Sequence, residues 1–302
     1  MIISHRISIY RVISGTWKHF LFNITTCILT YIAYHFLKSP HFEISILIPS
    51  ILGTALAFFI GFNNNQSYDR WWEARKIWGA LVNDSRTWAR QIVYFPGTNG
   101  DEEKYKVFVN TAVHRHIAFL YALKQSLRKS DVKEYKKYLS NEDVATIASE
   151  ANKANALLSL QTRDLNEFYK SGGIDGFRFS EMNKMLVNFS DEMGKSERIA
   201  NTVFPTSYNF YNLIFIWFFI VFATLFTAQT AGSWSILAGT LIGYVFLTIH
   251  KIGLSLLNPF EDIPTGISLN QITRTIEINM LQTLKKNDIP SPIESVNGEY
   301  VM

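Results

Sequence analysis

Long apolar runs alternate with amphipathic stretches along the chain. A helix that crosses a hydrocarbon core of about 30 Å needs roughly 20 mainly apolar residues. Four segments come close to that length, and they fall into two pairs. Their ranges are 17–37, 44–62, 208–228 and 233–257. The pattern predicts four transmembrane helices, with a short link inside each pair.

Polar residues interrupt the first and the last of these segments. The first segment contains Lys18, His19, Asn23 and His35. Most of them lie near its ends, where long side chains reach the headgroups. His250 and Lys251 lie near the end of the fourth segment, and we expect them to face protein, water or headgroups.

The block between the two pairs, residues 63–205, is predicted to be helical rather than a linker. Apolar residues recur at helical spacing, as in Trp71, Ala74, Ile77, Trp78 and Leu81. A second helix is expected over about 103–130. Ser140 or Asn141 is expected to cap a further helix that extends toward Leu160.

Membrane and cytosolic segments interleave in the sequence. This favours one continuous all-α domain over 1–302, with a cytosolic part at 63–205 and a C-terminal arm at 258–302. Beyond about Lys286 that arm is expected to be extended or flexible, because it contains Pro290 and Pro292.

Composition agrees with a membrane protein. The chain is 48% hydrophobic and 15% aromatic, yet its mean hydropathy is only +0.05, so the apolar residues are concentrated in part of it. The net charge of +4 fits basic residues beside membrane spans better than a nucleic-acid partner. Cys27 is the one cysteine, so no intrachain disulfide forms, and we expect it in the core or facing lipid.

The distribution of Lys and Arg predicts the orientation. The link at 38–43 has one lysine and the link at 229–232 has no charge, whereas the N-terminal arm and the central block are basic. Basic residues favour the cytoplasmic side, so both termini and the block are expected there. No cleavable signal pattern is present, and the first span is expected to direct the chain to an inner or plasma membrane.

The second span passes into a polar segment without a breaking proline. Thr54, Phe58 and Phe62 are four residues apart and share one helical face. In an oligomer whose second helices surround an axis, that face would form stacked apolar rings, which gate pores by dewetting. The alternative is that the two phenylalanines face lipid or a neighbouring helix.

Three further motifs carry a resemblance. FNNNQSYDRWWEARKIWG follows the second span, SERIANTVFP precedes the third at Val203–Pro205, and LLNPFEDIPTGISLNQITRTIEINML follows the fourth. Together with the paired spans around a long insert, they resemble the bestrophin family, particularly its bacterial members. The resemblance implies a funnel-shaped homopentamer with one central ion pore and a hydrophobic neck.

The resemblance also assigns residues. Thr54, Phe58 and Phe62 correspond to the neck, although Thr54 departs from the apolar pattern with its hydroxyl. A second, cytosolic constriction would fall near Phe177. The three amides after the neck either face a partly dehydrated ion or form polar interface surface. They are Asn63, Asn64 and Asn65.

The first and the third of these motifs contain charged residues that can be compared with known ion sites. A calcium clasp follows Asn-Pro-Phe in animal bestrophins, but here Glu261 and Asp262 are the only acids at that place, and calcium prefers six to eight oxygen ligands. We therefore expect no bound metal and no cofactor, and these two acids are expected to form a charge patch or intersubunit contacts. Asp69, Arg70 and Glu73 are expected to form buried cytosolic ion pairs.

Other classes of function have less support. The sequence has no P-loop, GxSxG, HExxH or paired CxxC motif, and His114 and His116 point to different helical faces, so an enzyme is not expected. A secondary transporter is a less favoured alternative, because it would show related halves and broken spans, and Pro49 in the second span is the one candidate break. A membrane scaffold stays open. The leading prediction is a channel for monovalent anions such as chloride, with a sodium or potassium channel as the alternative. Its expected partners are further copies of itself and the bilayer.

Overall fold

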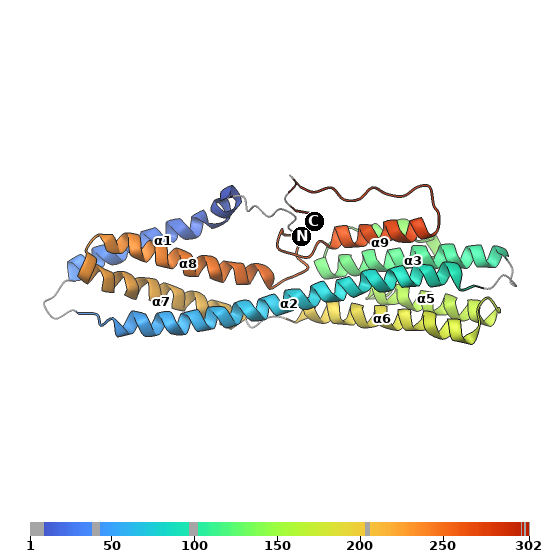
Figure 1. Cartoon of the computed structure of the whole chain (residues 1–302), viewed down its shortest axis with the longest axis horizontal. Helices are drawn as coiled ribbons and strands as arrows, with labels where there is room; N and C mark the ends of the chain where they lie inside the picture. Colours follow the sequence, from blue (N-terminus) through green and yellow to red (C-terminus); the bar gives the residue numbers. More distant parts are fainter. Residues whose placement is uncertain are drawn as a thin grey trace. The chain divides into compact units, whose positions relative to one another are not determined.

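The regular elements in the part of the chain that the structure describes are helices. A computed structural model describes residues 9–37, 43–96, 102–202, 206–296, 298, 300 and 301, and its one β-type pairing in these ranges is an isolated bridge between Val296 and Tyr300 (Figure 1). The expected motif at Val203–Pro205 lies outside the described residues. The all-helical prediction therefore agrees with the part of the chain that is described.

The chain divides into two compact units, each assembled from separate sequence segments. The span unit contains the described residues up to Trp71 and those from 206 to Leu257. The insert unit contains Trp72–Thr202 and the described residues from Asn258 onward. Each unit is built from segments that are separated in the sequence, as the interleaving predicts. The contacts between residues group the chain into two compact units.

Four helices build the span unit: α1 (Ile9–Leu37), the first part of α2 (Leu47–Tyr94), α7 (Thr206–Ala231) and α8 (Trp234–Leu256). Three of them, α2, α7 and α8, are long and apolar enough to cross a membrane. Among the described residues, α1 does not reach that level of apolarity, although it covers the predicted span 17–37. Its polar residues lower its mean hydropathy.

Asn23 on α1 and His250 on α8 face protein, whereas Lys18, His19 and His35 on α1 are exposed. Asn23 is fully buried, and its amide donates a hydrogen bond to the carbonyl oxygen of Thr240 at 2.8 Å. His250 is buried too, and the ammonium of Lys251 binds the carbonyl oxygen of Gly15. These contacts fasten α1 to α8, and they satisfy groups that lipid could not.

The core of the span unit lies between α1, α2, α7 and α8. It is made of Cys27, Leu56, Ile60, Ile216, Phe219, Ile220, Ala223 and Leu247. Small residues let the helices approach each other: a Cβ atom on Gly239 would overlap the hydroxyl oxygen of Thr224 on α7. Cys27, predicted as either core or lipid-facing, is a core residue.

The insert unit joins the second part of α2 to α3 (Glu102–Arg128), η1 (Glu134–Tyr138), α4 (Asn141–Thr146), α5 (Lys153–Lys170), α6 (Gly176–Asn201) and α9 (Leu269–Thr283). Its largest fully buried side chains include Trp78, Trp88, Phe119 and Phe189. In Figure 1, α9 runs along α3, and α5 lies beside α6.

The helix expected between residue 140 and Leu160 is two helices. Ser140 caps α4 by accepting a hydrogen bond from the backbone N–H of Asp143, as predicted, but α4 ends at Thr146. The next helix, α5, has its own cap, since the Asn152 side chain accepts from the backbone N–H of Asn155 at 3.0 Å. A second cap so soon after the first divides the segment.

The tail beyond α9 is extended, as expected from its prolines, but its end is tied down. Val301 is buried, and its carbonyl oxygen accepts a hydrogen bond from the hydroxyl of Ser268. The C-terminal arm 258–302 therefore contains a packed helix, α9, followed by a strap that returns to the start of that helix.

Candidate functional site

One face of α2 in the span unit is left uncovered. Phe58 and Phe62 are 70% and 50% exposed. Thr54, one turn before them, is only partly covered and donates its hydroxyl hydrogen within the helix. The opposite face packs into the unit, where Leu56 and Ile60 are each 2% exposed. The three residues predicted to form the neck therefore lie together on the free side of one unbroken 48-residue helix.

Ring contacts position Phe58 and Phe62, and a hydrogen bond to the backbone positions Thr54. The ring of Phe62 lies 6.5 Å from that of Tyr208 on α7, and the Phe58 ring packs edge-on against Phe59 at 5.9 Å. The hydroxyl of Thr54 donates to the carbonyl oxygen of Ser50 at 2.9 Å. Its hydrogen atom is thus used within the helix, so Thr54 does not offer a donor to a passing anion.

The three asparagines after Phe62 separate by role. Asn63 is fully buried and donates to the side-chain oxygen of Asn209 at 3.2 Å. Asn64 donates to the carbonyl oxygen of Ile249 at 3.1 Å. Asn65 is exposed and lies two turns beyond Phe58, on the same face. Asn63 and Asn64 are packing residues here, and Asn65 stays available to solvent or an ion.

Phe177 stands at the beginning of α6 in the insert unit. It is 89% exposed. The cap residue Asp175 accepts a hydrogen bond from the backbone N–H of Arg178 at 2.9 Å, and this bond holds the pKa of the Asp175 carboxyl below its usual value. A capped helix end thus presents an apolar side chain to the outside, which is what the predicted second constriction needs.

The polar segment after Phe62 does not bury its charges as the sequence led us to expect. Glu73 pairs with Arg198 on α6, at 2.7 Å, but the Glu73 side chain is 44% exposed and that of Arg198 64% exposed. Asp69 is also exposed, and Arg70 is half-buried. The expectation of burial is wrong for Asp69 and Glu73, because this stretch of α2 keeps its polar side toward the outside.

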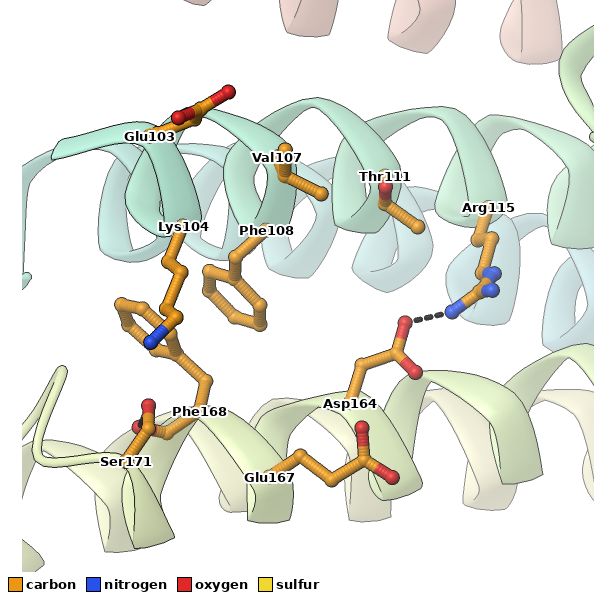
Figure 2. A pocket seen from close by; sticks show the side chains of 10 residues that line it. All are labelled: Glu103, Lys104, Val107, Phe108, Thr111, Arg115, Asp164, Glu167, Phe168 and Ser171. Carbon is orange, nitrogen blue, oxygen red and sulfur yellow. Dashed lines mark hydrogen bonds and ion pairs between the residues drawn. The ribbon is translucent and has the colours of Figure 1, made fainter. Parts of the chain in front are cut away.

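A groove between α3 and α5 has no counterpart among the sequence predictions. It encloses about 620 Å³, and its floor is the stacked pair Phe108 and Phe168, with ring centroids 4.1 Å apart (Figure 2). Arg115 at one end is held by Asp164 and by Asp143 at 2.6 Å. The groove as a whole is lined by Glu103, Lys104, Val107, Phe108, Thr111, Arg115, Asp164, Glu167, Phe168 and Ser171.

The residues of this groove come from two helices that lie far apart in the sequence, so no local motif could indicate it. Its buried cation, Arg115, is already neutralised by two carboxylates. The groove therefore has an apolar floor and no unpaired buried charge among its lining residues. Such a surface suits apolar contacts better than ion binding.

Two buried titratable groups of the insert unit, Glu192 and His116, are kept uncharged. Burial raises the pKa of Glu192 to about 8, and the neighbouring carboxylate of Asp84 adds to the rise. Burial lowers the pKa of His116 to about 3, and this ring lies 2.8 Å from the hydroxyl of Ser85. Glu192 is therefore mostly protonated and His116 uncharged at neutral pH, where they pack between α2, α3 and α6.

An ion pair links the segment after Asn-Pro-Phe to α3. The guanidinium of Arg128 lies 2.8 Å from the carboxylate of Asp262 and also donates to the carbonyl oxygen of Phe260. The positive charge that faces Asp262 in this turn is thus an arginine side chain.

In the described part of the chain, no group of three or more His, Cys, Asp or Glu residues is placed to hold a metal. His116 is buried while His114 is half-exposed, as expected of two different helical faces.

A family model and several relatives match most of this chain. The family described as "Bacterial/Fungal Bestrophin protein" matches residues 4–282. The "Voltage-dependent anion channel-forming protein YneE" of Salmonella typhi is 30% identical over 243 residues, which cover 80% of this chain and 78% of the relative. The protein of the same name from Escherichia coli strain K12 is 29% identical, with 81% and 78% covered.

Solved structures show the same fold. A bacterial bestrophin homologue from Klebsiella pneumoniae superposes with a TM-score of 0.82 at 25% identity, covering 89% of this chain and 98% of that one. A crystal structure of a membrane protein variant gives 0.83 at 25% identity, with 90% and 100% covered. The match over nearly the whole length, in sequence and in fold, shows that this chain is a membrane protein of the bacterial and fungal bestrophin family.

Proposed function

We propose that the protein is the subunit of an anion channel. The observation that carries the proposal is the exposed face of α2, where Phe58 and Phe62 stand outward while the opposite face is packed. Two exposed phenylalanines one turn apart become stacked apolar rings when several copies surround an axis. The relatives named as voltage-dependent anion channel-forming proteins support the same interpretation.

The proposed assembly is a homopentamer around one pore. Phe58 and Phe62 form the hydrophobic neck, and Thr54 adds a ring whose hydroxyl hydrogen is bound within the helix. Asn65 offers its amide to ions next to the neck. In the insert unit, Phe177 forms a second ring. The expected cargo is small monovalent anions such as chloride, and no catalytic chemistry takes part.

The proposed orientation places the insert unit and both termini in the cytoplasm. The short link at 229–232 has no charge, and the basic residues of the chain concentrate in the insert. Four spans, α1 included, give an even number of crossings, as this orientation requires. The first span is part of the proposal, since its polar Asn23 is buried against α8 instead of facing lipid.

One observation favours a cation channel as the second candidate. Asp69 is exposed on α2, four residues beyond Asn65 and on the same helical side. A ring of carboxylates beside a pore attracts cations and repels anions. The sign of selectivity thus depends on whether the field of Asp69 or that of the amides and arginines of α2 dominates.

Chloride efflux from liposomes containing the purified protein tests the proposal. The expected result is chloride efflux well above that of empty liposomes, which rises with the amount of protein. Mass measurement of the protein in detergent gives the number of copies. Absence of efflux from a correctly assembled oligomer would favour a scaffold instead.

A further inference from the structure

Two arginines of α2 differ from most arginines of the insert unit. Among the described residues, six arginines of this unit are ion-paired with a carboxylate. They are Arg115, Arg128, Arg163, Arg178, Arg198 and Arg274. Arg86 and Arg90 instead bind neutral oxygens: Arg86 donates to Asn279 at 2.9 Å, and Arg90 to Thr87 at 3.1 Å. In the part of the chain that the structure describes, neither of these two arginines forms an ion pair with a carboxylate.

These two arginines line one pocket. It lies between α2 and α9 and encloses about 510 Å³. Arg86 and Arg90 are one turn apart on α2, and the facing turn of α9 contributes neutral polar groups, namely Asn279, Gln282 and Thr283. No acid is found among its described lining residues. A concave site with two cations and neutral polar walls is built to receive an anion.

Hydrogen bonds orient the guanidinium groups of Arg86 and Arg90. Because the Asn279 side-chain oxygen accepts from Arg86, that guanidinium is oriented and its remaining N–H groups are directed elsewhere. The bond from Arg90 to Thr87 restrains the second guanidinium in the same way. Restrained arginines lose less side-chain freedom on binding, and their planar N–H pairs match the oxygens of a phosphate group.

The pocket lies near the C-terminal end of α9, where the helix dipole is negative. That effect is weakened, because the last carbonyl groups are already hydrogen-bonded: Leu284 donates to Met280, and the next two residues donate to Gln282 and Leu281. Those next two residues are Lys285 and Lys286, both exposed. These two lysines add positive charge beside this helix end.

We propose that this pocket binds a soluble phosphate group, either as inorganic phosphate or on a small phosphorylated molecule. Each arginine contributes a pair of N–H donors, and the amide of Gln282 contributes another. The volume exceeds that of the phosphate group alone and leaves room for the rest of a small molecule. The proposal concerns binding to the insert unit, and it holds whether or not the protein conducts ions.

Titration calorimetry of inorganic phosphate into the full-length protein in detergent, at low ionic strength, tests the site. Arg90→Gln is the main variant, because Arg90 bonds to Thr87 of its own helix, so its loss leaves the α2–α9 bond intact. Arg163→Gln is the matched control, since Arg163 is a half-exposed arginine on α5 outside the pocket. We expect phosphate binding to weaken at least tenfold in Arg90→Gln and to change less than twofold in the control.

A second readout guards against a folding defect. Phosphate is expected to raise the melting temperature of the wild type and of Arg163→Gln, but not that of Arg90→Gln. Equal loss of binding in both variants would overturn the proposal, as would the absence of binding to the wild type. If the wild type fails to bind phosphate and Arg90→Gln disrupts the oligomer, a carboxylate of a second copy occupies the pocket, and the proposal is wrong.

Discussion

The side-chain amide of Asn64 donates a hydrogen bond to the backbone carbonyl oxygen of Ile249 on α8, 3.1 Å away. One turn further along α8, Gly253 has no side chain, and a Cβ atom there would overlap the Asn64 side-chain oxygen. Asparagine and glycine thus fix the rotation of α2 against α8. That rotation leaves Phe58 and Phe62 on the uncovered side.

Gly253→Ala is expected to destabilise the protein by about 1–3 kcal/mol, because the added methyl group pushes the Asn64 side chain away from Ile249. Thermal unfolding in detergent measures the loss. The matched control is Gly194→Ala on α6, where nothing lies within 4 Å of an added Cβ atom. Combining Gly253→Ala with Asn64→Ala should recover part of the loss. Equal effects of the two glycine substitutions would contradict this packing.

Phe62→Ala is expected to raise the current at a given voltage severalfold. Removing the ring from each subunit widens the proposed neck and lowers the cost of passing a partly dehydrated ion. Single-channel recording measures the change. Phe218→Ala is the matched control, because Phe218 on α7 is 53% exposed, against 50% for Phe62. If both variants conduct like the wild type, Phe62 does not line the constriction.

The carboxylate of Glu277 binds α9 to α3 and η1 within the insert unit. It is 1% exposed and accepts hydrogen bonds from the hydroxyls of Tyr121 at 2.6 Å and Tyr138 at 2.5 Å. Glu277→Ala leaves two phenols without their acceptor, and we expect a loss of roughly 3 kcal/mol in the free energy of unfolding. Tyr138→Phe should cost about 1–2 kcal/mol.

Denaturant unfolding of the full-length protein measures both effects. Glu261→Gln serves as the control, since Glu261 is an exposed acid outside this cluster. If Glu277→Ala lowers the free energy of unfolding no more than Glu261→Gln does, the hydroxyls of the two tyrosines find other hydrogen-bond acceptors.

Glu192 makes stability depend on pH. Its pKa is about 8 in the folded protein against an ordinary value of 4.5, chiefly because of burial. Between these two pH values the folded state holds a proton that the unfolded state releases, so stability falls as pH rises from about 4.5 to 8. The slope from this one group is at most about 1.4 kcal/mol per pH unit.

Glu192→Gln imitates the protonated acid, so the variant should be more stable than the wild type at about pH 8 and similar to it near pH 4.5. Melting temperatures across that range measure the difference. Glu181→Gln is the control on the same helix, because Glu181 is exposed and paired with Lys184. A parallel pH dependence in wild type and Glu192→Gln would show that Glu192 is ionised in the folded state.

Periodicity predicts the helices well, since an apolar run or a repeated 3.6-residue pattern is a local property. The continuity of α2 follows from the absence of proline after Phe62. The break between α4 and α5 is harder to predict, because both caps are polar residues within a short stretch and either one would fit a single helix.

The site is predictable in part. Spacing alone places Thr54, Phe58 and Phe62 on one face, but it does not say which face the neighbouring helices cover. For the same reason the sequence does not separate Asn65 from Asn63 and Asn64, whose partners on α7 and α8 lie far along the chain. The spacing of seven residues from Phe58 to Asn65 is the available signal.

The reversal potential of the purified protein in a planar bilayer, under a potassium chloride gradient, tests the central claim most directly. An anion channel reverses near the chloride equilibrium potential, and Asp69→Asn should move the reversal potential further in that direction. Reversal near the potassium equilibrium potential, moved toward zero by Asp69→Asn, would contradict the anion channel and show that the exposed carboxylate of Asp69 selects cations.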